Sequence, residues 1–152
     1  MQHHVVEVTP TVSSGAAYDA ADQVGGLITL AGAVPAAGDG AILRQISVVD
    51  KAKQKAALNV LLFDAEPTVA SADNEAANVA DTEMAGKCLG AVSIAAGDYV
   101  DLSASSVATK ATTTPVKANG SASLYALLVT TGTPTYGSTS DLVLRFHFTW
   151  EG

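Results

Sequence analysis

The most constraining feature of this sequence is the alternation of apolar side chains along residues 141–150. The apolar positions lie two residues apart, at Leu142, Leu144, Phe146, Phe148 and Trp150. Because successive side chains of a strand point to opposite faces, this spacing predicts a β-strand with one buried face. A helix would distribute the same residues around its circumference. The stretch holds two of the three Phe residues and the only Trp, so we expect it to run along the core.

Seven further stretches have strand character: residues 5–12, 27–30, 41–49, 56–63, 89–95, 99–102 and 123–130. Two of them, 56–63 and 123–130, are apolar on both faces, which is typical of central strands that are covered on both sides. Simple alternation along 41–49 places Ile42, Ile46 and Val48 on one face and Leu43 on the other. The Ser-, Ala- and Thr-rich run that ends at Thr114 is not assigned to a strand.

The longest stretch without strand character, residues 68–90, contains one short predicted helix. Asp81 has the character of an N-cap. Glu83 follows in the first turn and Lys87 in the last turn, where each charge is favourable for the helix dipole. Met84 and Cys88 are four residues apart and are expected to face inward together. We expect this helix to cover an open end of the fold.

These elements predict an all-β fold, a β-sandwich or jelly roll of about eight or more short antiparallel strands with one short helix. Residues 1–12 form an extended N-terminal arm or an edge strand, because Pro10 cannot donate a hydrogen bond to a strand partner. Residues 13–152 form a single β-sandwich domain. A chain of this length can bury roughly 70% of its unfolded surface, so the fold needs no stabilising disulfide or metal. The single cysteine, Cys88, allows no intrachain disulfide.

The composition argues against several partners. The net charge is −7, and the eight Lys and Arg residues are dispersed, so no basic patch for nucleic acid is expected. No apolar stretch approaches the roughly 20 residues of a membrane span, and the first residues lack the pattern of a signal peptide. We therefore expect a soluble protein made in a cytoplasm. The scarcity of charge and the abundance of small residues favour a surface that neighbouring subunits cover.

No motif for a reaction centre is present, and we predict neither an enzyme nor a cofactor. His147 lies on the outward face of the last strand, where catalysis would require a base or nucleophile that no motif supplies. His3 and His4 are adjacent, so their side chains point apart in an extended segment and make a poor metal pair; a mobile terminus is the favoured interpretation. Trp150 could stack on a sugar, but its phase with Phe148 favours the core.

Two polar clusters have both a functional and a structural interpretation. Residues 73–75, Asp81 and Glu83 offer oxygen ligands for calcium, but their spacing matches no calcium loop. A solvated loop with a helix cap explains the same residues, and we favour this interpretation. Three lysines at alternate positions within residues 51–55 would share one side of an extended segment. They would contact an anion or an acidic partner, or form a solvated hairpin end, which we favour.

Several stretches carry a resemblance to a known family. They are Tyr18-Asp19 with the Val24-Gly25-Gly26 ending, residues 46–58, residues 61–64, the junction at 89–94, and residues 124–142. Together they resemble a family of small tailed-phage virion proteins whose genes usually lie beside that of the major capsid protein. The resemblance covers most of the chain from Ala17 onward, but not the first dozen residues or the end from Phe146. These patterns belong to a scaffold and contain no catalytic signature.

The resemblance implies a head decoration, or cement, protein: a β-sandwich that binds the outer capsid surface in many copies and stabilises the lattice by bridging capsid subunits. The implied partners are the major capsid protein and further copies of itself, as a dimer or trimer, with no nucleic acid and no membrane. The implied location is the outer capsid surface of the virion, after synthesis in the bacterial host cytoplasm. A tail or fibre component that binds a host receptor or glycan remains the alternative.

Two segments are predicted to contact the capsid or a neighbouring subunit. The N-terminal arm would add as a strand to a sheet edge, with disorder as the alternative. The loop at 132–140 would be a contact surface or simply a turn, which we favour slightly. The candidate contact residues are His3, His4, Val5, Val6, Val8, Thr9, Val12, Thr133, Pro134, Thr135 and Tyr136.

Overall fold

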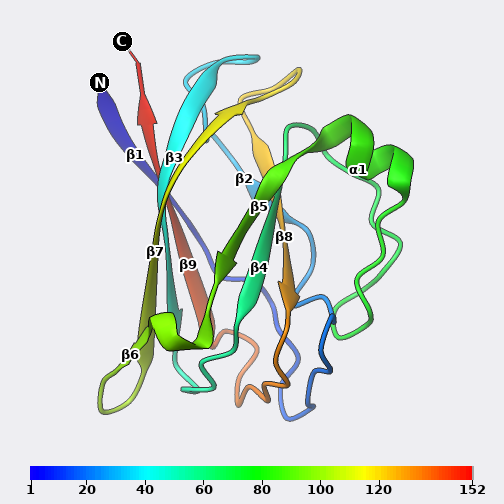
Figure 1. Cartoon of the computed structure of the whole chain (residues 1–152), viewed down its shortest axis with the longest axis vertical. Coiled ribbons are helices and arrows are strands. Elements are labelled where there is room, and N and C mark those ends of the chain that lie inside the picture. Colours follow the sequence, from blue (N-terminus) through cyan, green and yellow to red (C-terminus); the bar gives the residue numbers. More distant parts are fainter. Residues whose placement is uncertain (152) are drawn as a thin grey trace.

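A computed structural model describes residues 1–151, so Gly152, the last residue of the predicted domain, lies outside the described part. Nine strands, one α-helix and one short 3₁₀-helix make up the fold (Figure 1). The strands are β1 (Gln2–Val8), β2 (Ile28–Leu30), β3 (Gly40–Asp50), β4 (Leu58–Phe63), β5 (Cys88–Ile94), β6 (Tyr99–Asp101), β7 (Ser106–Lys117), β8 (Leu124–Thr130) and β9 (Leu142–Trp150). The helices are α1 (Asp81–Lys87) and η1 (Ala96–Asp98).

The strands form two antiparallel sheets packed face to face. One sheet has the order β1-β9-β3-β7-β6, and the other has the order β2-β8-β4-β5. Leaving out the three-residue strand β6, the remaining eight strands have the order of a jelly roll, in which most connections pass from one sheet to the other. The predicted all-β sandwich, with its antiparallel strands and one short helix, is confirmed.

Strand β9 occupies the place that its alternation predicts. It lies between β1 and β3, and its side chains at Leu142, Leu144, Phe146 and Phe148 are fully buried between the sheets. Trp150 is half-buried, packs against the same core, and donates a hydrogen bond from Nε1 to the carbonyl oxygen of Ala33 at 2.9 Å. The last strand is therefore the central apolar element of its sheet.

The first residues belong to the sandwich. Strand β1 pairs with β9 in antiparallel register over its whole length, from Gln2 opposite Trp150 to Val8 opposite Leu144. Of the two expected forms of residues 1–12, the structure shows the edge strand. The expectation of a mobile terminus at His3 and His4 is wrong, because backbone pairing with β9 orders both residues.

Strand β3 departs from simple alternation. A β-bulge between Leu43 and Gln45 shifts its register with both β7 and β9. Leu43 therefore faces the core together with Ile46, whereas Ile42 lies on the outer face. The predicted grouping of Ile42 with Ile46 is wrong, because the extra residue of a bulge reverses the phase of a strand. The bulged residue, Arg44, donates from Nε to Oγ1 of Thr149 at 3.1 Å.

The longest strand, β7, was not predicted. Its 12 residues pair with β3 along the whole length and with β6 at the beginning. Pro115 lies beyond the pairs with β6, on the part of β7 that forms the edge of the sheet, where a missing N–H is tolerated. The small and polar side chains of β7 give it the composition of a loop, so the sequence did not predict a strand here.

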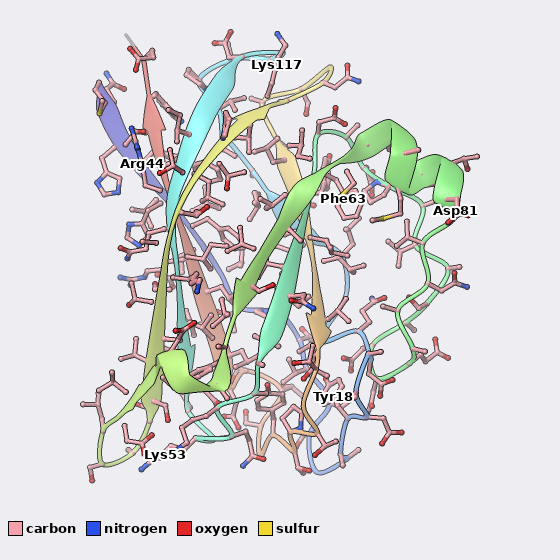
Figure 2. The ribbon with its side chains drawn as sticks, in the orientation of Figure 1. Tyr18, Arg44, Lys53, Phe63, Asp81 and Lys117 are labelled. Carbon is pink, nitrogen blue, oxygen red and sulfur yellow. The ribbon has the colours of Figure 1, made fainter. Side chains whose placement is uncertain are left out.

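The segment between β4 and β5 covers part of the outer face of the four-stranded sheet. Phe63 is fully buried but lies outside the main core, on the side that faces α1 (Figure 2). Figure 1 places α1 outside this sheet rather than over an opening between the sheets, contrary to expectation. Within residues 1–151, no helix has the length and apolarity required to cross a membrane.

Two local predictions about α1 are wrong. The N-cap is Ala80, and Asp81 is the first helical residue, with no side-chain capping bond. Glu83 instead accepts the backbone N–H of Thr68 at 2.6 Å and pairs with Lys87 Nζ at 2.9 Å. Cys88 is half-buried at the start of β5, not enclosed under the helix. The helix is held by polar contacts, because it buries no side chain fully.

Candidate docking surface

The outer face of the five-stranded sheet is a regular surface built from parallel rows of side chains, and we call it the open face. Register across β1, β9, β3 and β7 arranges its side chains in four rows, and none of these side chains is buried. The rows are Val143, Val49 and Val107; then Glu7, Arg145, Ser47 and Thr109; then Val5, His147, Gln45 and Ala111; and last His3, Thr149, Ile42 and Pro115.

No segment within residues 1–151 lies over the open face, whereas the segment leading to α1 lies over the other sheet (Figure 1). In Figure 2, Arg44 projects outward from the open-face side of the molecule, and Phe63 lies on the opposite sheet. A shallow depression of about 360 Å³ lies between the first two rows and is lined by Ser47, Val49, Val107, Val143 and Arg145. The open face is therefore gently contoured and accessible to a large partner.

The rows of the open face are almost free of net charge. Glu7 and Arg145 are the two charged residues in the four rows, and Glu7 Oε2 lies 2.9 Å from Arg145 Nη2. Arg44, at the bulge of β3, adds one cation beside the fourth row, where its Nε donates to Oγ1 of Thr149. Small or neutral side chains occupy the other positions. In a protein of net charge −7, this low density of charge limits the desolvation cost that charged groups would impose on a docked partner.

His147 lies in the third row beside His3. Its Nδ1 is 3.2 Å from His3 Nε2, and the ring centroids are 5.3 Å apart. Partial burial lowers the pKa of His147, and the nearby His3 and Arg145 lower it further. The two histidines therefore form a contact between β1 and β9. No carboxylate hydrogen bond to His147 is present among the described residues.

The structure separates the predicted contact residues into two groups. His3, Val5, Thr9, Thr133 and Thr135 are exposed, while His4 and Val8 are half-buried. The remaining four side chains lie in the interior of the domain and are not available to another molecule. This correction applies to Val6, Val12, Pro134 and Tyr136.

The loop at 132–140 binds other loops of the same chain. Tyr136 packs edge-on against Tyr18, with ring centroids 5.9 Å apart, and the carbonyl oxygens of Tyr136 and Pro134 accept the N–H groups of Gly15 and Tyr18. Asp141 accepts the N–H groups within this loop through Oδ2. These contacts join two of the stretches that carry the family resemblance, residues 18–26 and 124–142. The favoured interpretation of the loop as a turn agrees with this role.

Asp73 holds the same end of the sandwich together. Its Oδ1 accepts from Tyr18 Oη at 2.6 Å and from the N–H of Gly25 at 2.7 Å, and its Oδ2 accepts from Ser13 Oγ at 2.6 Å. Burial raises the pKa of Tyr18 to about 12, and the bond to Asp73 acts in the same direction. Sequence reasoning placed Asp73 in a possible calcium loop, but its oxygens are occupied by donors from the chain.

The lysines at 51–55 do not share one side of an extended segment. Both Lys53 and Lys55 have a φ of 52°, so the backbone turns sharply. The buried carboxylate of Asp50 accepts three backbone N–H groups of this turn at 2.9 Å each. Lys55 Nζ then pairs with Asp101 at 3.1 Å, and Lys53 Nζ donates to the carbonyl oxygen of Leu102. The three lysines therefore do not line up on one side of the chain, although they occupy alternate positions in the sequence.

Other candidate ligands also remain apart. Within residues 1–151, no group of three or more His, Cys, Asp or Glu side chains converges in a geometry suited to a metal ion. None of the Phe, Trp or Tyr side chains in this part of the chain is exposed, and the indole of Trp150 lies 4.5 Å from the ring of His4. A flat aromatic platform for a sugar is therefore absent from the described surface.

Sequence reasoning missed the residues that β3 and β7 contribute to the open face. The relevant signal was the alternation of Val107, Thr109 and Ala111 with residues of the other face. Thr and Val favour strands, but Ala and Pro115 weaken the pattern. Comparison of the chain with family models, curated proteins and solved structures gave no match.

Proposed function

We propose that this chain is a decoration, or cement, protein that binds the outer surface of a tailed-phage capsid and stabilises the lattice by bridging capsid subunits. The observation that carries the proposal is the open face, an uncovered surface of nearly neutral side chains on a rigid sandwich. The major capsid protein is the proposed partner on this face. The role is structural rather than catalytic, and the proposed location is the outside of the virion.

The charge distribution supports a position outside the shell. A protein with 15 acidic and eight basic residues would be repelled by packaged DNA if it lay inside. Its acidic side chains lie mainly in loops and turns, as Asp39, Asp73 and Asp141 do. The open face has only Glu7 as an acid, so a capsid surface can approach it without strong repulsion.

The jelly-roll core supports a mechanical role. The inward side chains of β4 and β8, and those of β9 from Leu142 to Phe148, are buried, so the sandwich has the close-packed, rigid core that this role requires. Each contact with the capsid needs only modest affinity, because an oligomer that binds several sites at once gains avidity. Jelly rolls occur in viral capsid proteins and in lectins, so the fold alone does not decide between these roles.

The proposal is tested with capsids that were assembled without this protein, from the phage whose genome encodes it. We expect stoichiometric binding and a higher temperature of capsid disruption. Substitution of Ala111→Lys places a charge at an exposed position in the third row of the open face and should weaken binding at least about tenfold. Binding is measured by co-sedimentation, and disruption by release of a DNA-binding dye.

The matched control is Ala91→Lys, which adds the same charge at an exposed alanine on β5, in the other sheet. This variant should bind as the wild type does. Equal binding by both variants would show that the open face is not the docking surface. Absence of any association at micromolar protein would contradict the proposed function itself.

A further inference from the structure

We propose that a second copy of this chain pairs with the free edge of β1, so that two five-stranded sheets become one continuous antiparallel sheet across a twofold axis. This pairing does not depend on capsid binding. It assigns the partner of a strand whose outer backbone groups have no partner within residues 1–151. The argument rests on the edge itself, on its register and on the side chains that the register brings opposite each other.

The edge of β1 is the one that lacks protection. An exposed edge strand normally carries a proline, a bulge or a lysine, or is very short, because its unpaired N–H and C=O groups otherwise recruit another strand. Strands β2 and β6 have three residues each, β7 contains Pro115, and β5 has a register shift beside Gly90. Strand β1 has seven residues, pairs with β9 without a shift, and contains no Pro, Gly or Lys.

The sequence of β1 complements itself around Val5. In an antiparallel pair centred on Val5, this residue lies opposite Val5 of the second copy, and all seven residues of the strand find partners. His3 then lies opposite Glu7 of the second copy, and the twofold axis repeats this pair on the other side. The imidazole of His3 can donate a hydrogen bond to the carboxylate of Glu7, and the central pair of valines is apolar; hydrogen-bonded and apolar pairs directly across an antiparallel ladder are stabilising. A pair centred on His4 or Val6 is shorter and loses the contact between His3 and Glu7.

The exposed apolar side chain at the centre supports the same arrangement. Val5 is 42% exposed, although it lies in the middle of a strand and on the margin of the open face. Pairing would cover this side chain with its symmetry mate. It would also join the two open faces edge to edge, which would double the surface presented on one side. Because one strand pair buries little area, we expect a moderate affinity.

The first test is sedimentation velocity on the full chain between about 1 µM and about 1 mM, a range suited to a moderate affinity. We expect a monomer–dimer equilibrium. Val5→Lys places two like charges directly opposite each other and should raise the dissociation constant at least about tenfold. The control, Val100→Lys, changes an exposed valine in β6, at the other edge of the same sheet, and should leave the equilibrium unchanged.

A charge series tests the register. His3→Lys places a cation opposite Glu7 of the second copy and should preserve or tighten the dimer, whereas His3→Glu places two carboxylates opposite each other and should weaken it. We expect the two dissociation constants to differ about tenfold, because the pair occurs twice. Circular dichroism and thermal unfolding of each variant establish that the monomer remains folded. Equal dissociation constants for His3→Lys and His3→Glu would contradict this register.

Disulfide cross-linking tests directly whether position 5 lies opposite position 5 of the second copy. In a Cys88→Ser background, Val5→Cys places two thiols at the axis, where opposed Cα atoms lie about 4.5–5.5 Å apart, within the range of a disulfide. Mild oxidation should produce a covalent dimer, and Val100→Cys should not. A chain that is monomeric throughout the concentration range, or that cross-links no faster through position 5 than through position 100, would overturn the proposal.

Discussion

At the scale of single residues, buried or half-buried carboxylates organise the loops of this protein. Asp50 accepts three backbone N–H groups in the turn after β3, and Asp73 accepts three donors from residues 13–25. Within the described residues, neither acid belongs to a group of three or more His, Cys, Asp or Glu side chains that could hold a metal ion. These groups replace hydrogen bonds that irregular backbone cannot make with itself.

Removal of the Asp73 carboxylate should therefore loosen the end of the sandwich near Tyr18. We expect Asp73→Ala to lower the free energy of unfolding by about 3 kcal/mol, because the bonds from Tyr18, Ser13 and Gly25 lose their common acceptor. Urea denaturation measures the change. Glu75→Ala is the control, since Glu75 is exposed and accepts only one nearby N–H, from Ala72. Equal losses in both variants would contradict the role of Asp73.

The phenol of Tyr18 should make the fold sensitive to alkali. An ordinary tyrosine ionises near pH 10, whereas burial and the bond to Asp73 raise the pKa of Tyr18 to about 12. The unfolded chain releases this proton first, so stability should be intact below about pH 10 and should fall as the pH rises to about 12. Burial also raises the pKa of Tyr99 and Tyr136, so these residues add to the same loss.

The melting temperature, followed by circular dichroism from pH 8 to about pH 12, measures this sensitivity. Tyr18→Phe removes one of the three contributing phenols. The variant should therefore show a shallower decline at high pH, although its stability at pH 8 is also reduced by the lost bond to Asp73. A decline as steep as that of the wild type would contradict the assignment to Tyr18.

At the scale of elements, β9 is the strand on which the packing of both sheets depends. Its inward side chains lie between β1 and β3 within the sheet and face the second sheet across the core. The opposite side of the same strand contributes Val143, Arg145, His147 and Thr149 to the open face. One strand therefore supplies both the stability of the domain and part of its proposed docking surface.

Truncation of a core side chain of β9 should be costly. Phe146→Ala is expected to destabilise the domain by about 3–5 kcal/mol, because a fully buried aromatic side chain leaves a cavity. Thr149→Ala, on the outer side of the same strand, is expected to cost about 1 kcal/mol or less. Chemical denaturation measures both values. A small loss for Phe146→Ala would contradict the central position of β9.

Two features of the strands could not be predicted from the alternation of apolar and polar side chains: the bulge in β3 and the existence of β7. In β3, the bulge at Arg44 places Ile42 and Ile46 on opposite faces of the strand. The residues around Arg44 contain no Gly or other signal that would have predicted this bulge. In β7, every second side chain belongs to the open face and is not packed in the core, so small polar residues suffice there. The sequence of β7 consequently has the composition of a loop, and its pairing with β3 becomes evident only in the structure.

At the scale of the whole molecule, local stability should be highest in the central strands and lower in the segment between β4 and β5. Strands β4, β8 and β9 are paired on both sides, whereas residues 64–87 are held by scattered backbone hydrogen bonds and side-chain contacts instead of a continuous ladder. Hydrogen exchange by mass spectrometry should show the slowest exchange in β8 and β9 and faster exchange in residues 65–82. Uniform protection across these regions would contradict this ranking.

The sequence by itself determined the fold class, most strands and the central role of residues 141–150. Period-two burial is a local property, so Leu142 to Trp150 reveal it without any partner. Only the tertiary structure decided that residues 2–8 are an edge strand, that Arg44 is bulged, that β7 exists, and that Asp73 meets Tyr18. Each of these depends on residues distant in the chain, whose contacts form only when both sheets are assembled. The open face is likewise a product of register between strands, and no single stretch of sequence contains it.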